Sequence, residues 1–289
     1  MLFRSYKTEV ITITNNGKAN AIHTGMQYVP EDTDFVITCD SDTEFDKNFV
    51  KNALKRFYPS VGAVVGEVKI KNTTGFNNIF DVVYYYSFNV WRASMSYFGH
   101  VSVLSGACTM MRYNVAKSVM GDYVKRNIRI GEDRYLTYLI LKEGWETVFA
   151  PNAIAYTESP TGMKFIKQQL RWYRSFWDGV VYSRDLYFDR MFIPYTIDTL
   201  IQVFSRMFAV LLWFAIIVSV YLGLWNVIAL ISVSLIVSSS VRGLYGAIVE
   251  EDSSFIPKMI LWGFVSVIFT PPLHMYALFT RKNGNWLTR

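Results

Sequence analysis

The stretch DFVITCDSDT, residues 34–43, joins an apolar run to two carboxylates. Continuous apolar residues that stop abruptly in acidic ones are typical of a buried parallel strand whose carboxyl end opens onto a binding site. Asp40 and Asp42 are two residues apart, so in extended backbone both side chains point the same way. Such a pair can hold a hard divalent cation, which neutralises a diphosphate. The alternative is a loop with solvated acids and an Asx turn.

The segments on either side of this stretch alternate between strand and helix patterns. A strand is predicted over residues 10–14, and a helix over 18–28 follows the turn Asn15-Asn16-Gly17. After the acidic stretch, helical spacing over 46–58 precedes a strand over 61–69. Alternation of this kind predicts an α/β layered domain.

The second half of the predicted domain continues in the same way. The expected elements are a long aromatic helix over 76–97, a strand over 101–111 interrupted at Ser105-Gly106, a helix over 131–142, a short strand over 145–150 and a helix from 161 or 162 to about 180. The aromatic helix is interpreted chiefly as packing, because aromatic stripes mostly pack. At Gly106 the missing Cβ would let the backbone approach a ligand.

Lys18 lies at the predicted turn between a strand and a helix. Exposed backbone N–H groups and an ammonium group can both face phosphate oxygens at such a turn. The alternative is a surface lysine at the start of a helix.

Glu132, Asp133 and Arg134 begin the helix predicted over 131–142. A carboxylate in a cleft can accept the proton of an attacking sugar hydroxyl, which is general-base catalysis. The alternative is a pair of acids that complement the helix dipole, a stabilisation of about 0.3–1 kcal/mol. Two adjacent acids with an arginine exceed what that stabilisation requires, but the spacing leaves both interpretations open.

Gln168, Arg171 and Trp172 are spaced i, i+3 and i+4, so they share one helix face. An indole can stack on a hexose, while amide and guanidinium groups can bind hydroxyls and phosphates. The alternative is an amphipathic helix whose tryptophan lies in the membrane interface. Both interpretations can hold at once.

Apolar runs dominate the C-terminal part of the 289-residue chain, and they cover residues 207–224, 227–241 and 259–280. The first is 18 residues without charge, which is the lower limit for crossing a hydrocarbon core about 30 Å thick. The predicted plan is a soluble domain over 1–180, an amphipathic helix in the interface over 181–203, and a transmembrane region over 204–289. Lysine and arginine counts leave the orientation open.

Net charge is +6, and basic residues are interleaved with acidic ones. This pattern disfavours a nucleic-acid partner and favours a domain that rests on anionic lipid. Residues 1–10 are polar and lack the apolar core of a secretory signal. Cys39 and Cys108 are too few for a disulfide framework, and their apolar neighbours predict reduced core thiols in a cytosolic compartment.

With these clusters in this order and three apolar runs behind them, the chain resembles the processive family 2 inverting glycosyltransferases. These include hyaluronan synthases, chitin synthases, the rhizobial chitooligosaccharide synthase and cellulose synthase. The motifs SGAC (105–108), GEDRYLT (131–137) and QQLRW (168–172) look most like the hyaluronan synthase and chitooligosaccharide synthase branch. The resemblance covers roughly residues 13–289. It implies a GT-A-like nucleotide-sugar domain that lacks its first strands, an interfacial helix and about three transmembrane helices.

The resemblance also implies a role for each cluster. A Mg²⁺ or Mn²⁺ ion would be held chiefly by Asp42 with Asp40, and Asp133 would be the base with Glu132 beside it. The donor and acceptor would be bound by Lys18, Asp40, Ser105, Gly106, Cys108, Arg134, Gln168, Arg171 and Trp172. Lys18 and Asp40 would face the UDP moiety, and Trp172 the acceptor sugar.

The implied reaction is attack by a hydroxyl of the growing polysaccharide on C1 of a UDP-sugar, with inversion to a β linkage. The enzyme would be a multi-pass protein of the plasma membrane with a cytoplasmic catalytic domain, in contact with lipid. Hyaluronan synthesis from UDP-GlcNAc and UDP-GlcA is the first expectation, and chitin synthesis from UDP-GlcNAc alone is the alternative. A non-catalytic membrane partner is a third reading, and a transporter is disfavoured because three spans are few.

There is one large departure from the family pattern. Members begin the domain with a strand, a helix and another strand that hold the uracil, whereas only a short segment precedes Lys18 here. The resemblance therefore implies that the first half of the nucleotide site is missing or supplied by another chain, as in a truncated or split synthase.

Overall fold

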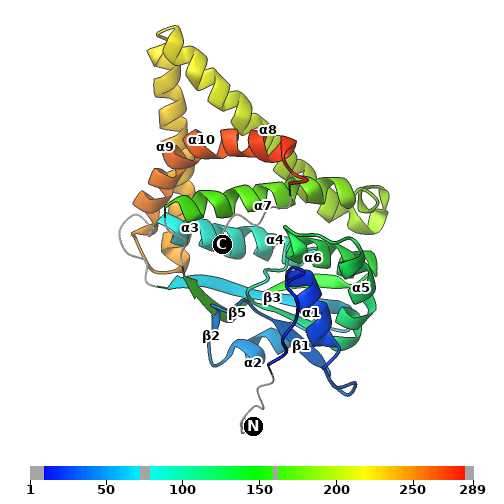
Figure 1. Ribbon diagram of the computed structural model, residues 1–289. Coiled ribbons are helices and arrows are strands. Elements are labelled where there is room, and N and C mark those ends of the chain that lie inside the picture. Colours follow the sequence, from blue (N-terminus) through cyan, green and yellow to red (C-terminus); the bar gives the residue numbers. More distant parts are fainter. Residues whose placement is uncertain (1–9, 72–78, 159–161, 284–289) are drawn as a thin grey trace.

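The computed structural model describes residues 10–71, 79–158 and 162–283 (Figure 1). Its centre is a mixed five-stranded sheet of order β1-β4-β3-β5-β2. The strands are β1 (Phe35–Thr38), β2 (Glu44–Phe45), β3 (Val61–Lys71), β4 (Thr109–Arg112) and β5 (Glu146–Glu158). Only β3 and β5 pair in parallel, while the pairs β1–β4, β3–β4 and β2–β5 are antiparallel. This sheet is the α/β core that the sequence predicts.

The middle strand β3 is the most buried part of the sheet. Val61, Val64 and Val65 are fully buried, as is Ala63 between them. Their β-branched side chains suit a strand that is covered on both faces. Figure 1 shows three helices between the sheet and the long apolar helices: α3 (Ile79–Tyr85), α4 (Ala93–Tyr97) and α7 (Met163–Tyr182). Helix α2 (Phe49–Leu54) lies on the far side of the sheet.

The acidic stretch follows β1, but this strand differs from the expectation. It pairs antiparallel with β4, from Phe35 opposite Arg112 to Thr38 opposite Thr109, and it is half-buried. Within the part of the chain that the structure describes, no strand pairs with its other edge. The prediction of a buried parallel strand was therefore wrong, because an apolar run this short does not report on how many neighbours the strand has.

Three neighbouring expectations also need correction. Residues 10–17 contain no strand, and the helix predicted over 46–58 is shorter, since α2 ends at Leu54. Of the strand predicted over 101–111, only β4 forms. Residues 101–108 are a buried loop whose polar backbone atoms bond to side chains and to other loops instead of a ladder.

Three helices surround the acidic clusters of the sequence. They are α1 (Lys18–Met26), α5 (Tyr113–Lys125) and α6 (Glu132–Lys142). A fourth helical rod combines α3 (Ile79–Tyr85), a π-helical turn (Tyr86–Arg92) and α4 (Ala93–Tyr97). This rod covers most of the predicted aromatic helix. Its middle turn, the π-helical one, is wider than an α-helical turn.

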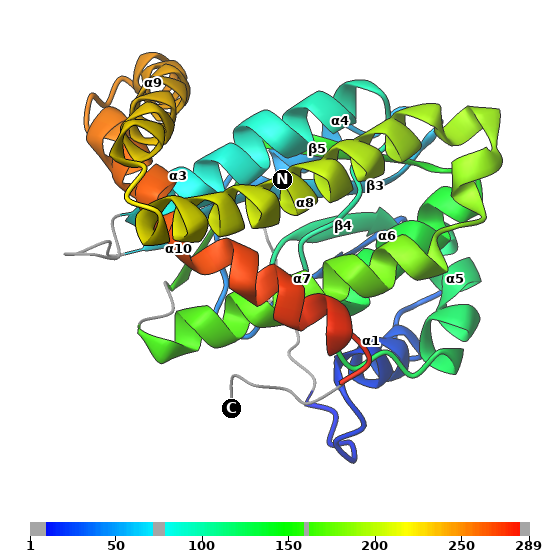
Figure 2. The same ribbon diagram turned by 90° about the horizontal axis from the view of Figure 1, so that it is seen from above.

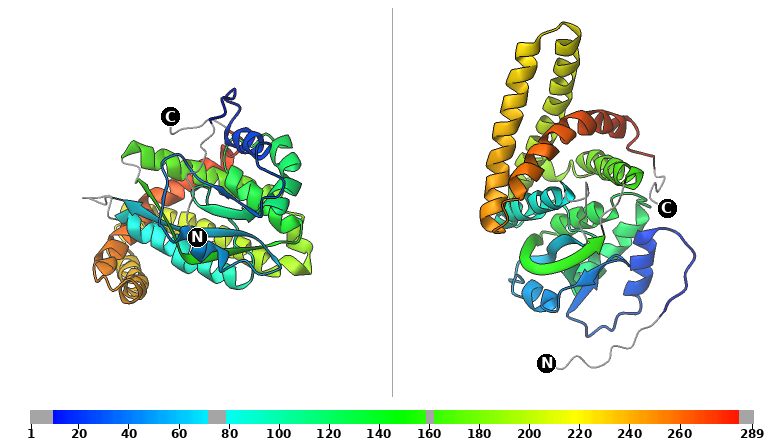
Figure 3. Two further views of the ribbon diagram at one scale, coloured as in Figure 1. Left: turned by 90° about the horizontal axis from the view of Figure 1, so that it is seen from below. Right: turned by 90° about the vertical axis from the view of Figure 1, so that its left-hand side faces the viewer.

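Among the residues that the structure describes, three helices are long and apolar enough to cross a membrane. They are α8 (Ile193–Tyr221), α9 (Trp225–Val249) and α10 (Phe255–Phe279). Helices α8 and α9 project from the domain as a hairpin, as the right-hand view of Figure 3 shows. Helix α10 instead crosses over α7 (Met163–Tyr182), seen from above in Figure 2, and it contains Pro271 and Pro272.

The separate interfacial helix predicted over 181–203 does not form. Two 3₁₀ turns, Leu186–Phe188 and Arg190–Phe192, lead directly into α8. The Asp189 side chain accepts a hydrogen bond from the backbone N–H of Met191, and Pro194 lies in the first turn of α8. A capping acid and a proline in the first turn favour a helix start at this place, which amphipathic periodicity alone does not locate.

Replacing Gly66 with alanine tests the packing of the sheet. A Cβ at Gly66 would lie 2.4 Å from the carbonyl oxygen of Ala153 and 2.6 Å from the Phe49 ring. Since backbone must shift to admit it, we expect Gly66→Ala to destabilise the fold by about 1–3 kcal/mol. Thermal unfolding of the detergent-solubilised protein would show a melting temperature several degrees lower.

Gly121→Ala is the matched control, because a Cβ there meets nothing within 4 Å. The position lies inside α5, where alanine is favoured over glycine by about 0.5–1 kcal/mol. An equal loss of melting temperature in both variants would show that the close approach at Gly66 is not the cause.

Candidate active site

Lys18 is the centre of the candidate site, and it owes its place to the turn before α1. Gly17 has φ 91°, a conformation that favours glycine, and Lys18 is the first residue of the helix. Its ammonium group forms an ion pair with Asp40 and lies 3.9 Å from Glu132 Oε1. Opposite, a Cβ at Gly106 would be 2.6 Å from Lys18 Nζ. Four separate segments therefore meet at one amine.

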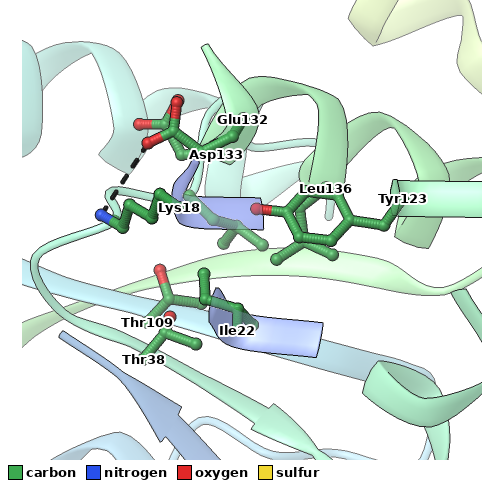
Figure 4. Close-up of a pocket in the computed structure, with 10 residues that line it drawn as sticks. Lys18, Ile22, Thr38, Thr109, Tyr123, Glu132, Asp133 and Leu136 are labelled. Atoms are coloured by element: carbon green, nitrogen blue, oxygen red, sulfur yellow. Dashed lines mark ion pairs between the residues drawn. The ribbon is translucent and has the colours of Figure 1, made fainter. Parts of the chain in front are cut away.

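A small cavity of about 10 Å³ lies beside this amine (Figure 4). Its lining residues are Lys18, Ile22, Thr38, Leu104, Gly106, Thr109, Tyr123, Glu132, Asp133 and Leu136. A space of this size holds about one water molecule. The Lys18 side chain crosses the site toward Glu132, and the dashed line in Figure 4 marks that ion pair.

Burial opposes the charge on Lys18, but nearby carboxylates outweigh it. Asp40 is the strongest of them, with Glu132 and Asp133 behind it, and together they raise the pKa of the lysine. The ammonium group is therefore protonated at neutral pH, where it can pair with the oxygens of a phosphate as it now does with Asp40.

Glu132 and Asp133 form the first turn of α6. Gly131 before them has φ 79°, and a Cβ at this position would collide with the Ser175 hydroxyl of α7. Burial first, and Asp133 second, raise the pKa of Glu132 to about 7, against the opposing charge of Lys18. One Asp133 oxygen accepts a hydrogen bond of 2.8 Å from the N–H of Arg134. The structure thus brings both acids into the cavity that Lys18 lines.

Tyr84 connects the α7 motif to this region. The Gln168 side chain and the charge of Arg171 favour ionisation of its hydroxyl, and the charge of Asp42 opposes it. Burial raises the pKa of this tyrosine to about 12. The Trp172 ring contacts Tyr84 edge-on at 6.0 Å between centroids, and it keeps 39% of its surface exposed. An exposed indole of this kind is available for stacking.

Asp42 does not line the cavity. It is exposed in the turn after β1, and it lies close enough to Tyr84 to influence that hydroxyl. Within the described ranges, no group of three His, Cys, Asp or Glu side chains could hold a metal ion. Mg²⁺ usually takes only one or two carboxylates and completes its shell with substrate phosphates and water. Asp40 and Asp42 therefore fit a cation that arrives with a diphosphate.

The motif at 105–108 forms a tight turn that presents Gly106 to Lys18. The Ser105 carbonyl accepts hydrogen bonds from the Cys108 N–H at 3.1 Å and the Thr109 hydroxyl at 2.7 Å. Cys108 is fully buried, and burial raises the pKa of its thiol to about 12. It is a neutral core thiol, as the sequence predicts. Cys39 is exposed, so the same expectation was wrong for it, because its neighbouring acid ends the strand in solvent.

Arg134 is directed away from the cavity. Its guanidinium lies over the Phe176 ring at 5.6 Å, and its side chain passes Gly179, both on α7. Arg134 therefore packs between α6 and α7, and its position does not support a role in substrate binding.

The sequence does not identify four residues that lie near the site: Arg92, Tyr84, Tyr123 and Thr137. Tyr84 and Arg92 belong to the aromatic helix that the sequence assigns to packing, and Tyr123 faces the cavity from α5. Thr137 is part of the quoted motif GEDRYLT but lies one turn after its acids. The sequence offers one signal for Thr137: it is four residues after Asp133, and residues four apart share a helix face.

Comparison with known proteins agrees with the fold and the motifs. The family model described as "Glycosyltransferase like family 2" matches residues 4–175, which is more than half of the chain. The chain therefore belongs to glycosyltransferase family 2. Its described sheet and helices resemble the mannosyltransferase PcManGT from Pyrobaculum calidifontis, solved with GDP-Man and Mn²⁺, with TM-score 0.55 and 15% identity. That match covers 88% of this chain and 67% of the other, and it supports the GT-A-like fold.

Sequence relatives point to one branch of the family. Similar proteins include an N-acetylglucosaminyltransferase of Azorhizobium caulinodans, 29% identical over 89% of this chain and 66% of the relative. Hyaluronan synthase 2 of Xenopus laevis is 29% identical over 94% of this chain and 50% of its own length. An N-acetylglucosaminyltransferase of Rhizobium leguminosarum bv. viciae is 32% identical over 95% and 66%. The chain thus spans about half to two thirds of the length of these relatives.

The pKa of Glu132 leads to a testable dependence of stability on pH. Its folded-state pKa is about 7, against about 4.3 in an unfolded chain. Between these values the folded protein keeps a proton that the unfolded chain has released, so stability falls as pH rises from about 4.5 to about 7. We expect Glu132→Gln to flatten this fall, measured as melting temperature between pH 5 and 8.

Glu143→Gln serves as its control, since Glu143 is an exposed glutamate at the other end of the same helix. A pH profile of Glu132→Gln that stays parallel to the wild-type profile would contradict the assignment of a buried, protonated Glu132.

Proposed function

We propose that the chain is a membrane-embedded, processive, inverting β-glycosyltransferase that polymerises UDP-sugars and makes hyaluronan from UDP-GlcNAc and UDP-GlcA. The observation that carries this proposal is the meeting of Glu132 and Asp133 with Lys18 in one cavity, where Lys18 also pairs with Asp40. Membership of family 2 and relatives named hyaluronan synthase support it. Chitin synthesis from UDP-GlcNAc alone is the alternative, supported by relatives named N-acetylglucosaminyltransferase.

Donor binding in this proposal uses the N-terminus of α1. Lys18 exchanges part of its pairing with Asp40 for the oxygens of the UDP diphosphate, and the free N–H groups of the first helical turn face the same anion. Because the cavity is only about 10 Å³, the Lys18 side chain moves when the diphosphate enters. Asp40 and Asp42 would hold the Mg²⁺ or Mn²⁺ ion, whose charge would stabilise the departing diphosphate.

Acceptor activation is assigned to Asp133. Its carboxylate takes the proton of the attacking sugar hydroxyl while that oxygen bonds to C1 of the donor and the bond from C1 to the diphosphate breaks. Attack from the face opposite the leaving group inverts the anomeric centre. Glu132, whose pKa is raised to about 7, carries less negative charge beside Asp133 near neutral pH than an ordinary glutamate would.

The acceptor sugar is assigned to the face of α7 next to Tyr84. The Trp172 indole stacks on the terminal sugar, while Gln168 and Arg171 contact hydroxyl groups and the donor phosphates. Arg171 also lies within electrostatic range of Glu132, which supports a single site made of both groups of residues.

The three apolar helices of the described chain support a location in a membrane. We assign the enzyme to the plasma membrane as a multi-pass protein in contact with lipid, with the catalytic domain in the cytoplasm. The growing polysaccharide leaves along these helices. The interleaved charges give no basis for a nucleic-acid partner.

Radiolabelled UDP-sugars, supplied singly and in pairs to membranes that contain the protein, distinguish the proposed products. Polymer that requires both UDP-GlcNAc and UDP-GlcA identifies hyaluronan, and polymer from UDP-GlcNAc alone identifies chitin. The 289-residue chain is expressed alone in one experiment and together with its upstream genomic region in the other. Absence of any transfer in both forms would leave a non-catalytic membrane partner as the explanation and refute the enzyme.

Asp133→Asn tests the assigned base. Asparagine keeps the size of the side chain but cannot accept the proton, so polymer formation should fall by at least about 100-fold, while UDP affinity remains. Initial rates of UDP release and calorimetric titration with UDP measure the two effects.

Asp122→Asn, an exposed acid on α5, is the corresponding control and should retain wild-type rates. Full turnover by Asp133→Asn would remove the base assignment, whereas loss of UDP binding in that variant would indicate a structural role instead.

A further inference from the structure

The peptide group between Val103 and Leu104 is held by side chains at both of its polar atoms. Arg92 Nε donates a hydrogen bond of 3.0 Å to the Val103 carbonyl, and the Leu104 N–H donates one of 2.9 Å to the Thr137 hydroxyl oxygen. Leu104 is 1% exposed and Thr137 is fully buried. This peptide lies in the loop that precedes Gly106, where no strand ladder is available to bind it.

The Thr137 hydroxyl continues this chain of bonds to the proposed base. It donates a hydrogen bond of 2.7 Å to the Asp133 carbonyl, one turn earlier on α6. A single hydroxyl group therefore joins the loop that carries Gly106 to the residue that carries the catalytic carboxylate. The bond to Leu104 is buried and the bond to Asp133 is partly buried, so losing the Thr137 hydroxyl would leave the Leu104 N–H without water to replace it.

Arg92 is fixed just as firmly on the other side of the peptide. It ends the π-helical turn, its Nη1 donates to the Ser87 carbonyl at 3.0 Å and to the Ser87 hydroxyl at 2.6 Å, and its guanidinium lies 4.2 Å from the Phe88 ring centroid. Burial lowers the pKa of Arg92 to about 10, and Asp133 is the charged neighbour that opposes this most. The guanidinium remains protonated at neutral pH.

Gly106 follows the held peptide by two residues, and it lies against Lys18 and within reach of Asp133. A Cβ at this position would lie 2.6 Å from Lys18 Nζ and 3.9 Å from the Asp133 Cβ. The position of the peptide therefore sets how far the loop tip stands from both groups. A displacement here moves the amine that faces the donor relative to the carboxylate that faces the acceptor.

We propose that Arg92 and Thr137 are positioning residues for glycosyl transfer: they clamp the Val103–Leu104 peptide and so fix the distance between Lys18 and Asp133. Neither residue contacts substrate in this arrangement. The inference rests on the proposed function, since it assigns the distance a role in that reaction. Small errors in such distances cost much, because a misplacement of about 1 Å can lower a rate by about 100-fold.

Thr137→Val and Thr147→Val form a matched pair that tests the clamp. Thr147 is also fully buried, and its hydroxyl donates a hydrogen bond of 2.8 Å to the Val101 carbonyl of the same loop, outside the cavity lining. We expect Thr137→Val to lower kcat by about 10- to 100-fold while UDP affinity and donor KM stay near wild type. Thr147→Val should retain kcat, and Thr137→Ser, which keeps the hydroxyl, should restore most of it.

Arg92→Met supplies an independent variant on the other side of the peptide. If both residues act through one peptide, the double variant Arg92→Met/Thr137→Val loses no more kcat than the worse single variant. Multiplied losses would show separate roles and overturn the proposal. An equal fall in Thr137→Val and Thr147→Val would overturn it too, because generic destabilisation would then explain both.

Hydrogen–deuterium exchange tests the clamp without any activity. Exchange of the Leu104 amide should accelerate by at least about 10-fold in Thr137→Val and in Arg92→Met, but not in Thr147→Val. Unchanged exchange in the first two variants overturns the clamp. A clamp that exchange supports in a wild-type protein that transfers no sugar would refute the proposed function alone, so the two failures are distinguishable.

Discussion

One ammonium group surrounded by three carboxylates organises the candidate site. Lys18 pairs with Asp40, which follows β1, and lies near Glu132 and Asp133 from α6, so its charge joins segments that are more than 100 residues apart in the chain. Removing it would leave several acids in a largely dehydrated space, where like charges repel strongly. The raised pKa values of Lys18 and Glu132 are two expressions of this balance.

The surrounding fold keeps that cluster small and closed. β3 and β5 form a rigid parallel pair, and α6 rests on it with the acids at its first turn. Gly106 lets its loop lie against the Lys18 amine, and Gly131 lets the start of α6 lie against Ser175 of α7, because neither glycine carries a Cβ. The cluster is therefore positioned by strands and helix ends, while Trp172 on α7 remains exposed for a partner that is not part of the chain. Such a division would suit the proposed polymerising enzyme, whose acceptor changes length at each cycle.

Sequence alone predicted much of this arrangement, for physical reasons. The turn before Lys18, the helix that begins at Glu132 and the three long apolar helices carry strong local signals, namely a glycine, two acids and long uncharged runs. The direction and exposure of β1 carry none, because strand pairing is decided by residues far away in the chain. Tyr84 and Arg92 were missed for the same reason. Each lies in an aromatic helix whose packing role is real, and only the fold shows which of its faces meets the site.

The paired prolines of α10 bear on its course across α7. Pro271 and Pro272 lack backbone N–H groups, so two consecutive hydrogen bonds of the helix are absent at its middle. A helix that lacks two backbone hydrogen bonds bends at little cost, so α10 can bend where it crosses α7 while both of its ends stay helical. His274, two residues after these prolines, stacks on Tyr173 of α7 with 3.6 Å between ring centroids. The part of α10 with fewer internal hydrogen bonds is therefore also the part that packs on the domain, whereas the hairpin of α8 and α9 projects from it (Figure 3).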